Sequence, residues 1–184
     1  MPESTPRGGD TDPDPGLSRL NALTAEELRT DLAQCLDIER WVEALASEAP
    51  FTDRDTLLAR ADTHARAITG EEVAGALARH PRIGEKAKGR GTEANWSRGE
   101  QSAFASGTDD ATARVQRVFT AGQEEYEERF GQIYLVCASG RGPRDLLADL
   151  VERLYNDRDT ELAVVGDELR KIAGLRLVKL LESV

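Results

Sequence analysis

The sequence predicts an all-α protein. Aromatic residues make up only 5% of the 184 residues, whereas Ala, Leu, Glu and Arg, which favour helix over sheet, are abundant. Signals that start helices recur along the chain, and a single short run near residues 132–138 has strong strand character. The length suits one domain with a substantial core, because two independent domains would each be small and marginally stable.

Residues 1–16 are predicted to form a disordered tail. This stretch has few apolar residues and many Pro, Asp and Gly, so it can bury little surface. We expect ordered structure to begin near Leu17 and to continue to residue 184 as one helical domain.

Four helices are predicted in the first part of this domain. Capping boxes, in which Ser or Thr stands three residues before an acidic residue, mark helix starts. Three of the four helices have this spacing, at Thr24 with Glu27, Thr52 with Asp55, and Thr69 with Glu72. Pro50 and Pro81 stop the second and the fourth. The expected ranges are about 25–36, 38–46, 53–68 and 70–80.

The following stretch, residues 82–96, contains several glycines and shows no clear period, which predicts a loop. Ser97 and Glu100 then have the capping-box spacing, which predicts a short helix that ends near Ser106. The run QIYLVCAS has strand character but no second strand to pair with, so we expect an extended buried segment between helices. The remaining expected helices cover about 110–130, 143–156 and 159–182.

Charge and composition exclude several classes of partner. The net charge of −10 and a pI near 4.8 argue against nucleic acid or an anionic membrane surface, although a few cations can still attract a small anionic substrate. No stretch approaches the roughly 20 apolar residues that a membrane span requires. Cys35 and Cys137 stand in unrelated contexts, which favours a reducing compartment over a disulfide framework. We therefore expect a cytoplasmic protein.

Polar residues on apolar helix faces are informative, because burying one without a partner costs roughly 1–3 kcal/mol or more. His80 follows Leu77 by three residues and Val73 by seven, so it continues an apolar stripe at the end of a helix. Pro81 then turns the chain away from helical geometry. Two interpretations remain open: a core histidine or helix cap, and a general acid or base at a cleft.

Glu100 and Gln101 form the second informative pair. A capping role alone explains Glu100. Beside Trp96, however, a carboxylate, an amide and free backbone N–H groups at a helix start also suit an anionic or urea-like ligand.

Arg176 is the third. It falls within an apolar stripe of the last predicted helix, whereas Glu168 and Lys179 fall outside this stripe. An arginine among apolar neighbours needs an anion or several acceptors. A structural salt bridge to a buried Glu would supply them, and so would a substrate carboxylate or carbonyl. The stripe consists of Leu162, Val165, Leu169, Ile172, Arg176 and Leu180.

A transition-metal site is not expected. The chain has two histidines, no HExxH motif and no cysteine pair at ligand spacing. The loop GEKAKGRG has cations but lacks the Gly-Lys-Ser/Thr ending of a phosphate-binding loop.

Four motifs at these places resemble those of the 2-oxo-4-hydroxy-4-carboxy-5-ureidoimidazoline (OHCU) decarboxylase family. Each motif alone is weakly specific, but the four in the family's order and spacing are strongly specific. The likeness extends from about Leu17 to Leu181. The motifs are His80–Gly84, Ser97–Gln101, Glu128–Gly131 with the run Ile133–Ala138 that follows it, and Ile172 with Leu175–Leu177.

The resemblance implies a two-lobed helical fold, often homodimeric, that decarboxylates OHCU to (S)-allantoin in urate breakdown with no metal or organic cofactor. It implies that His80 is the catalytic histidine, with Pro81 beside the substrate, and that Glu100 and Arg176 are also catalytic. The substrate-binding residues it implies are Pro81, Ser97, Arg98, Gly99, Glu100, Gln101, Ile133, Tyr134, Leu135, Val136 and Cys137.

The residue types fit that chemistry. The substrate's C=N group can accept the electrons left by carbon dioxide, so the protein needs only to orient the ring and move a proton. His80 would be the acid or base, Glu100 would accept N–H bonds, and Arg176 would bind an oxygen other than the departing carboxylate.

Two rivals remain. A non-catalytic helical interaction module explains the amphipathic helices but not the placement of these three polar residues. A nucleic-acid binder that uses Arg82, Lys86, Lys88 and Arg90 conflicts with the acidic remainder of the chain.

Overall fold

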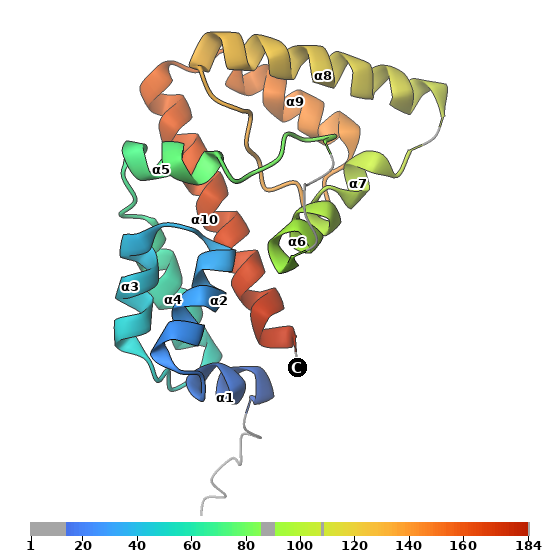
Figure 1. Cartoon of the computed structure of the whole chain (residues 1–184). Helices are drawn as coiled ribbons and strands as arrows, with labels where there is room; N and C mark the ends of the chain where they lie inside the picture. Colours follow the sequence, from blue (N-terminus) through green and yellow to red (C-terminus); the bar gives the residue numbers. More distant parts are fainter. Residues whose placement is uncertain (1–13, 86–90, 108, 184) are drawn as a thin grey trace, which may run out of the picture.

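The computed structural model describes residues 14–85, 91–107 and 109–183, and within them the all-α prediction is confirmed (Figure 1). The described residues form helices and connecting segments and contain no strand. None of these helices is both long and apolar enough to cross a membrane. The helices are α1 Pro15–Asn21, α2 Ala25–Cys35, α3 Glu39–Glu48, α4 Arg54–Ala65, α5 Gly70–Leu77, α6 Thr92–Glu100, α7 Ser102–Ala105, α8 Asp110–Phe130, α9 Pro143–Arg153 and α10 Arg158–Glu182.

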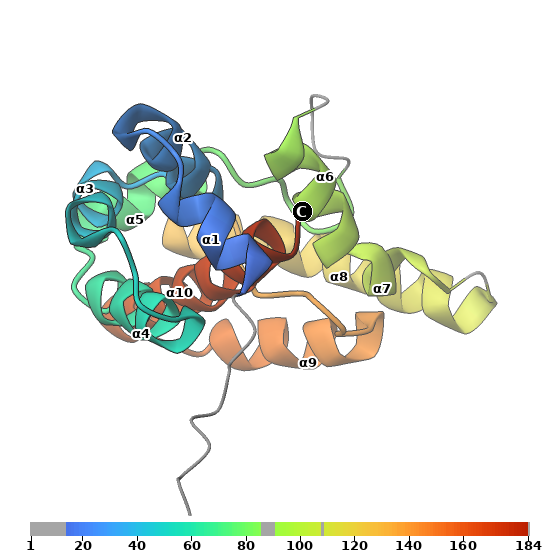
Figure 2. The same cartoon turned by 90° about the horizontal axis from the view of Figure 1, so that it is seen from below.

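The helices form two lobes, each with its own apolar core. The first core gathers buried residues of α1 to α5 and most of α10, and the second gathers those of α7, α8 and α9. Figures 1 and 2 show the lobes side by side, with α10 running from the end of the α8–α9 pair into the α1–α5 lobe. The apolar face of α10 belongs to the first core, and its first turn reaches the second lobe through Glu161, which bonds to Tyr126 and Arg153.

The segment at residues 132–138 is extended, as predicted, and it passes between the two cores. Leu135 is buried in the first core, and Ile133 and Cys137 pack against it. Tyr134 and Val136 are buried in the second core. Because successive side chains of an extended chain point to opposite sides, the apolar run serves both lobes at once. This explains strand-like composition without a strand partner.

Local capping signals behave largely as predicted. Thr24 and Thr69 both begin their helices with complete capping boxes. The third predicted helix, which is α4, instead begins after Asp53, whose carboxylate accepts the N–H of Thr56 at 2.7 Å, so the predicted cap Thr52 is one residue too early. Asp caps as well as Thr does, and the sequence alone does not separate adjacent candidates.

Ordered structure begins earlier than predicted. Asp14 caps α1 by accepting the N–H groups of Gly16 and Leu17, and it is ion-paired with Arg54 at 2.7 Å. That arginine, with the cap bonds, lowers the pKa of Asp14 to about 2. Residues 14–16 thus belong to the helical fold, and the predicted tail over residues 1–13 lies outside the described residues, as do Lys86, Lys88 and Arg90.

The predicted loop over 82–96 is wrong from Thr92 onward. Helix α6 begins there, after Gly91, and continues to Glu100. Ser97 and Glu100 are therefore not the cap and third residue of a new helix but two residues of the last turn of α6. Residues three apart in a helix share a face, and both side chains are buried. The glycines that predicted a loop precede the helix.

Candidate active site

A narrow cavity lies where the end of α5, the helix α6, the extended segment and α10 meet. Its volume is about 20 Å³, which holds about one water molecule. Most of the residues around it are ones that the sequence analysis singled out. The lining consists of His80, Pro81, Ile83, Ser97, Glu100, Gln101, Tyr134, Leu135, Val136, Ala138 and Ile172.

His80 reaches the cavity from the turn that follows α5. The helix ends at Leu77, earlier than predicted, and the N–H of His80 donates to the Leu77 carbonyl at 3.0 Å. Burial, with the positive charge of Arg176, lowers the pKa of His80 to about 4, although Glu100 acts in the opposite direction. The imidazole is therefore neutral at physiological pH and can accept a proton.

Arg176 is almost wholly buried, and it grips Glu100 through a two-point ion pair. Its Nε donates to Glu100 Oε1 at 2.9 Å, and its Nη2 donates to Glu100 Oε2 at 3.0 Å. The same Nη2 donates to the Ser97 hydroxyl at 3.0 Å, and Glu93 lies 3.7 Å from Nη1. Of the two interpretations of Arg176, the structure shows the salt bridge to a buried glutamate. That glutamate, Glu100, lines the cavity. Arg176 itself lies behind Glu100 and is not part of the lining.

Glu100 is held as a carboxylate. Burial acts to raise its pKa, but the hydrogen bonds and charge of Arg176, with Lys179 3.4 Å from Oε1, outweigh burial and lower it. A carboxylate fixed on one side by a guanidinium keeps lone pairs available to accept N–H donors from a ligand.

Gln101 lines the cavity, but its amide is already engaged. Its Oε1 accepts the N–H of Gly84 at 3.0 Å, and its Nε2 donates to the Arg82 carbonyl at 3.3 Å. Gly84 has a φ of +88°, a conformation that glycine adopts readily. Gln101 therefore fixes the turn that carries Pro81 and Ile83 into the cavity.

Some predicted site residues are not brought to the cavity. Arg98 and Gly99 lie on the exposed face of α6, where Arg98 also bonds to Asn95, because residues one and two positions from Ser97 point away from its face. Ile133 and Cys137 pack toward the first core instead. Alternation along the extended chain places Tyr134 and Val136 on the other side, whereas Leu135, on the same side as Ile133 and Cys137, still reaches the cavity lining.

Three lining residues were not predicted as site residues: Ile83, Ala138 and Ile172. Signals for each were present. Ile172 precedes Arg176 by one helical turn in the same stripe, Ile83 follows Pro81 by two residues, and Ala138 continues the alternation of Tyr134 and Val136. Leu162, predicted as part of the buried stripe, is 37% exposed.

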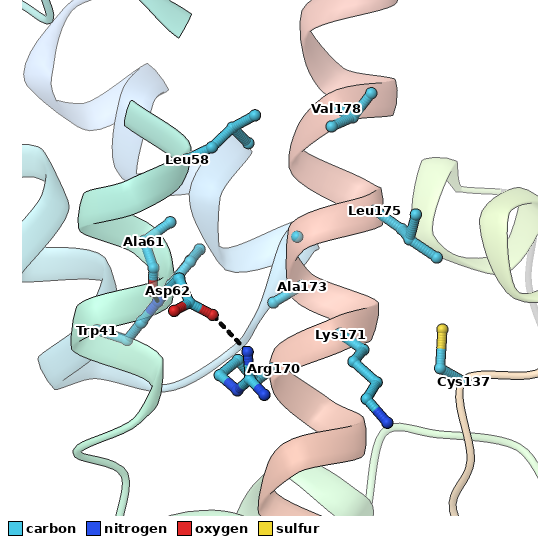
Figure 3. A pocket seen from close by; sticks show the side chains of 11 residues that line it. Trp41, Leu58, Ala61, Asp62, Cys137, Arg170, Lys171, Ala173, Leu175 and Val178 are labelled. Carbon is cyan, nitrogen blue, oxygen red and sulfur yellow. Dashed lines mark hydrogen bonds and ion pairs between the residues drawn. The ribbon is translucent and has the colours of Figure 1, made fainter. Parts of the chain in front are cut away.

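A larger hollow lies on another face of α10, between α4 and the extended segment (Figure 3). Apolar residues such as Leu58, Leu175 and Val178 dominate its lining, and its charged residues Arg170 and Lys171 are ion-paired. Cys137 faces this hollow rather than the cavity. The lining of the hollow includes no histidine. Within the described ranges, no three His, Cys, Asp or Glu side chains cluster as metal ligands.

The fold and the cavity define the class: an all-α protein of two lobes, with a small cavity between them that is lined by an imidazole and an ion-paired carboxylate. The family model for OHCU decarboxylase matches residues 21–178. The chain therefore belongs to the OHCU decarboxylase family.

Curated relatives are consistent with this assignment. The OHCU decarboxylase of Haloferax volcanii is 28% identical, and the match covers 91% of this chain and 96% of the relative. That of Amia calva is 27% identical, over 90% of this chain and 94% of the relative. The Arabidopsis thaliana uric acid degradation bifunctional protein TTL is 24% identical, and the match spans only 45% of that protein.

Solved structures share the fold. An OHCU decarboxylase crystallised in the presence of (S)-allantoin superposes with a TM-score of 0.68 at 23% identity, over 88% of this chain and 100% of that one. An (S)-allantoin synthase gives 0.64 at 17% identity, over 89% of this chain and 53% of that one.

Proposed function

We propose that this protein removes carbon dioxide from OHCU and releases (S)-allantoin in urate breakdown, as a carboxy-lyase without a cofactor. Membership of the family supports the reaction class. The observation that carries the proposal is the meeting of His80 and Glu100 on one small cavity, with Arg176 bound to Glu100 from behind.

The substrate supplies its own electron sink. Its carboxylate and hydroxyl share one ring carbon, next to a carbon that belongs to a C=N bond. When the C–C bond to the carboxylate breaks, the electron pair forms a new C=C bond, and the ring nitrogen takes up the displaced pair and a proton from solvent. The hydroxyl then loses its proton as the neighbouring carbon gains one, which yields the carbonyl and the new C–H bond of allantoin. The protein therefore has to orient the ring and move one proton on one face.

His80 is the group that moves this proton. Because its imidazole is neutral at physiological pH, it accepts the hydroxyl proton and returns it to the neighbouring carbon. Delivery from a fixed side of the cavity gives a single enantiomer.

Glu100 and its neighbours bind and orient the substrate. Glu100 accepts N–H bonds of the ureido group or ring, and Arg176 keeps it ionised and in place. An arginine that gripped the departing carboxylate directly would oppose its loss, which favours a role for Arg176 through Glu100. Pro81 and the backbone of the extended segment close the remaining sides.

Product optical activity tests the proposal. OHCU is generated in situ from urate by the preceding enzymes, the protein is added, and circular dichroism follows the formation of optically active allantoin. We expect His80→Gln to lower turnover about 100-fold or more. The matched control is His64→Gln. His64 lies on α4, outside the cavity lining, and its ring bonds to Glu48 of α3 at 2.8 Å. Racemic product at the spontaneous rate with the unaltered protein would defeat the proposal.

We also propose that the protein is a homodimer in the cytoplasm. The family resemblance supports the dimer, and Cys35 and Cys137, both free thiols, fit a reducing compartment. Light scattering coupled to size-exclusion chromatography distinguishes a mass of about 40 kDa from the monomer's 20.1 kDa. Cell fractionation tests the compartment.

A further inference from the structure

The extended segment presents a problem of backbone hydrogen bonding. It is buried between two cores and has no strand partner in the described part of the chain. Buried backbone N–H and C=O groups need partners, because an orphaned group costs as much as a lost hydrogen bond. Two buried charged side chains supply partners for two of these groups. Arg153 Nη1 donates to the Leu135 carbonyl, and Glu168 Oε2 accepts the Cys137 N–H, both at 2.7 Å.

Arg153 is itself tightly fixed. Its Nε and Nη2 donate to Glu161 at 2.9 and 2.6 Å, and its guanidinium lies 4.6 Å from the centre of the Tyr134 ring. Glu161 is wholly buried and also accepts the hydroxyl of Tyr126. The Leu135 carbonyl is thus held by a donor that has no freedom to move.

Glu168 binds the second of the two partnered backbone groups, the Cys137 N–H. It is only 6% exposed, although the sequence analysis placed it outside the buried stripe. Its second oxygen pairs with Lys171 at 2.6 Å. Glu168 precedes Ile172, a cavity residue, by one turn of α10, and Ile172 precedes Arg176 by another. One rigid helix therefore fixes both the extended segment and Glu100.

The two bonds determine where the polar groups of Val136 point. In an extended chain the N–H and C=O of one residue lie on one edge, and those of its neighbours lie on the other. The edge with Leu135 C=O and Cys137 N–H is held by Arg153 and Glu168. The N–H and C=O of Val136 therefore point away from these anchors, and neither has a partner among the residues described. Val136 lines the cavity.

We propose that Glu168 is a positioning residue of the active site. By holding the Cys137 N–H, it orients the Val136–Cys137 peptide and hence the edge of the segment against which the substrate ring is placed. The inference rests on the proposed function. A loosened edge lets the ring tilt relative to His80, which lowers turnover and lets the proton arrive on either face.

Variants of Glu168 separate positioning from charge. Glu168→Gln keeps an oxygen in place to accept the Cys137 N–H but removes the charge, and we expect turnover within about threefold of the unaltered protein. Glu168→Asp keeps the charge but withdraws the oxygen by one methylene, and we expect kcat to fall about 10-fold or more, since displacements near 1 Å cost up to 100-fold. Lys171→Met is the matched control, because it removes the ion pair and leaves the backbone bond, and we expect it to be unchanged.

Optical purity gives a readout that simple loss of folded protein does not move. Each variant is assayed at increasing enzyme concentration until the spontaneous reaction is negligible. A less stable but correctly built enzyme then regains the enantiomeric excess of the unaltered protein, whereas Glu168→Asp should stay below it. Asp more active than Gln, or Lys171→Met as impaired as Glu168→Asp, would overturn the proposal. Racemic product from the unaltered protein would instead refute the proposed function.

Discussion

Removing the guanidinium of Arg176 should destabilise the fold strongly, and neutralising Glu100 in addition should then cost less stability than it does in the unaltered protein. Breaking a buried ion pair by deleting one partner costs about 3–5 kcal/mol, because it leaves a buried charge unpaired. In Arg176→Met, Lys179 still lies 3.4 Å from Glu100 and partly compensates its charge. We therefore expect a loss of unfolding free energy at the lower end of this range, about 3 kcal/mol. For a chain of this length that corresponds to a fall in Tm of about 6–12 °C.

The double variant Arg176→Met, Glu100→Gln carries no unpaired carboxylate. Glu100→Gln alone should cost about 2–3 kcal/mol, since it leaves the guanidinium with Ser97 and a distant Glu93. If the pair is coupled as the distances indicate, the double variant loses at least about 1.5 kcal/mol less than the sum of the single losses. Urea unfolding measures all three variants. Strictly additive losses would refute the account of this pair, whereas activity should be lost in every variant.

Three further predictions concern the cavity and its surroundings. Because His80 has a lowered pKa of about 4 and works in its neutral form, kcat/KM should be flat from neutral pH down to about pH 5 and fall as pH drops through 4; an acid limb near 6.5 would contradict this. Gln101→Leu removes the two hydrogen bonds that fix the turn at Gly84, so kcat/KM should fall about 10-fold. An unchanged kcat/KM would show that the turn keeps its conformation without the Gln101 amide. Arg98→Ala changes the exposed face of α6, and kcat/KM should stay within about twofold; a tenfold fall would place Arg98 at the substrate.

Features governed by local chemistry were predictable from the sequence. The capping boxes at Thr24 and Thr69 lie where predicted, since a cap needs only residues three apart. The extended segment was also predictable, because its composition follows from burial on both sides.

Features governed by tertiary contacts were not predictable from the sequence. Ser97 and Glu100 have the spacing of a capping box and equally that of one helical face, and only Arg176, far along the chain, distinguishes the two. Glu168 was placed outside the apolar stripe of its helix, yet it is buried, and its carboxylate accepts the Cys137 N–H, a contact that no sequence pattern reveals.

The location of bound product tests the central claim most directly. Crystals of this protein grown with (S)-allantoin should show the molecule in the cavity, widened from its volume of about 20 Å³, with a polar atom within hydrogen-bond distance of the His80 ring and an N–H group facing Glu100. Allantoin in the apolar hollow between α4 and α10, with the cavity residues untouched, would contradict the account.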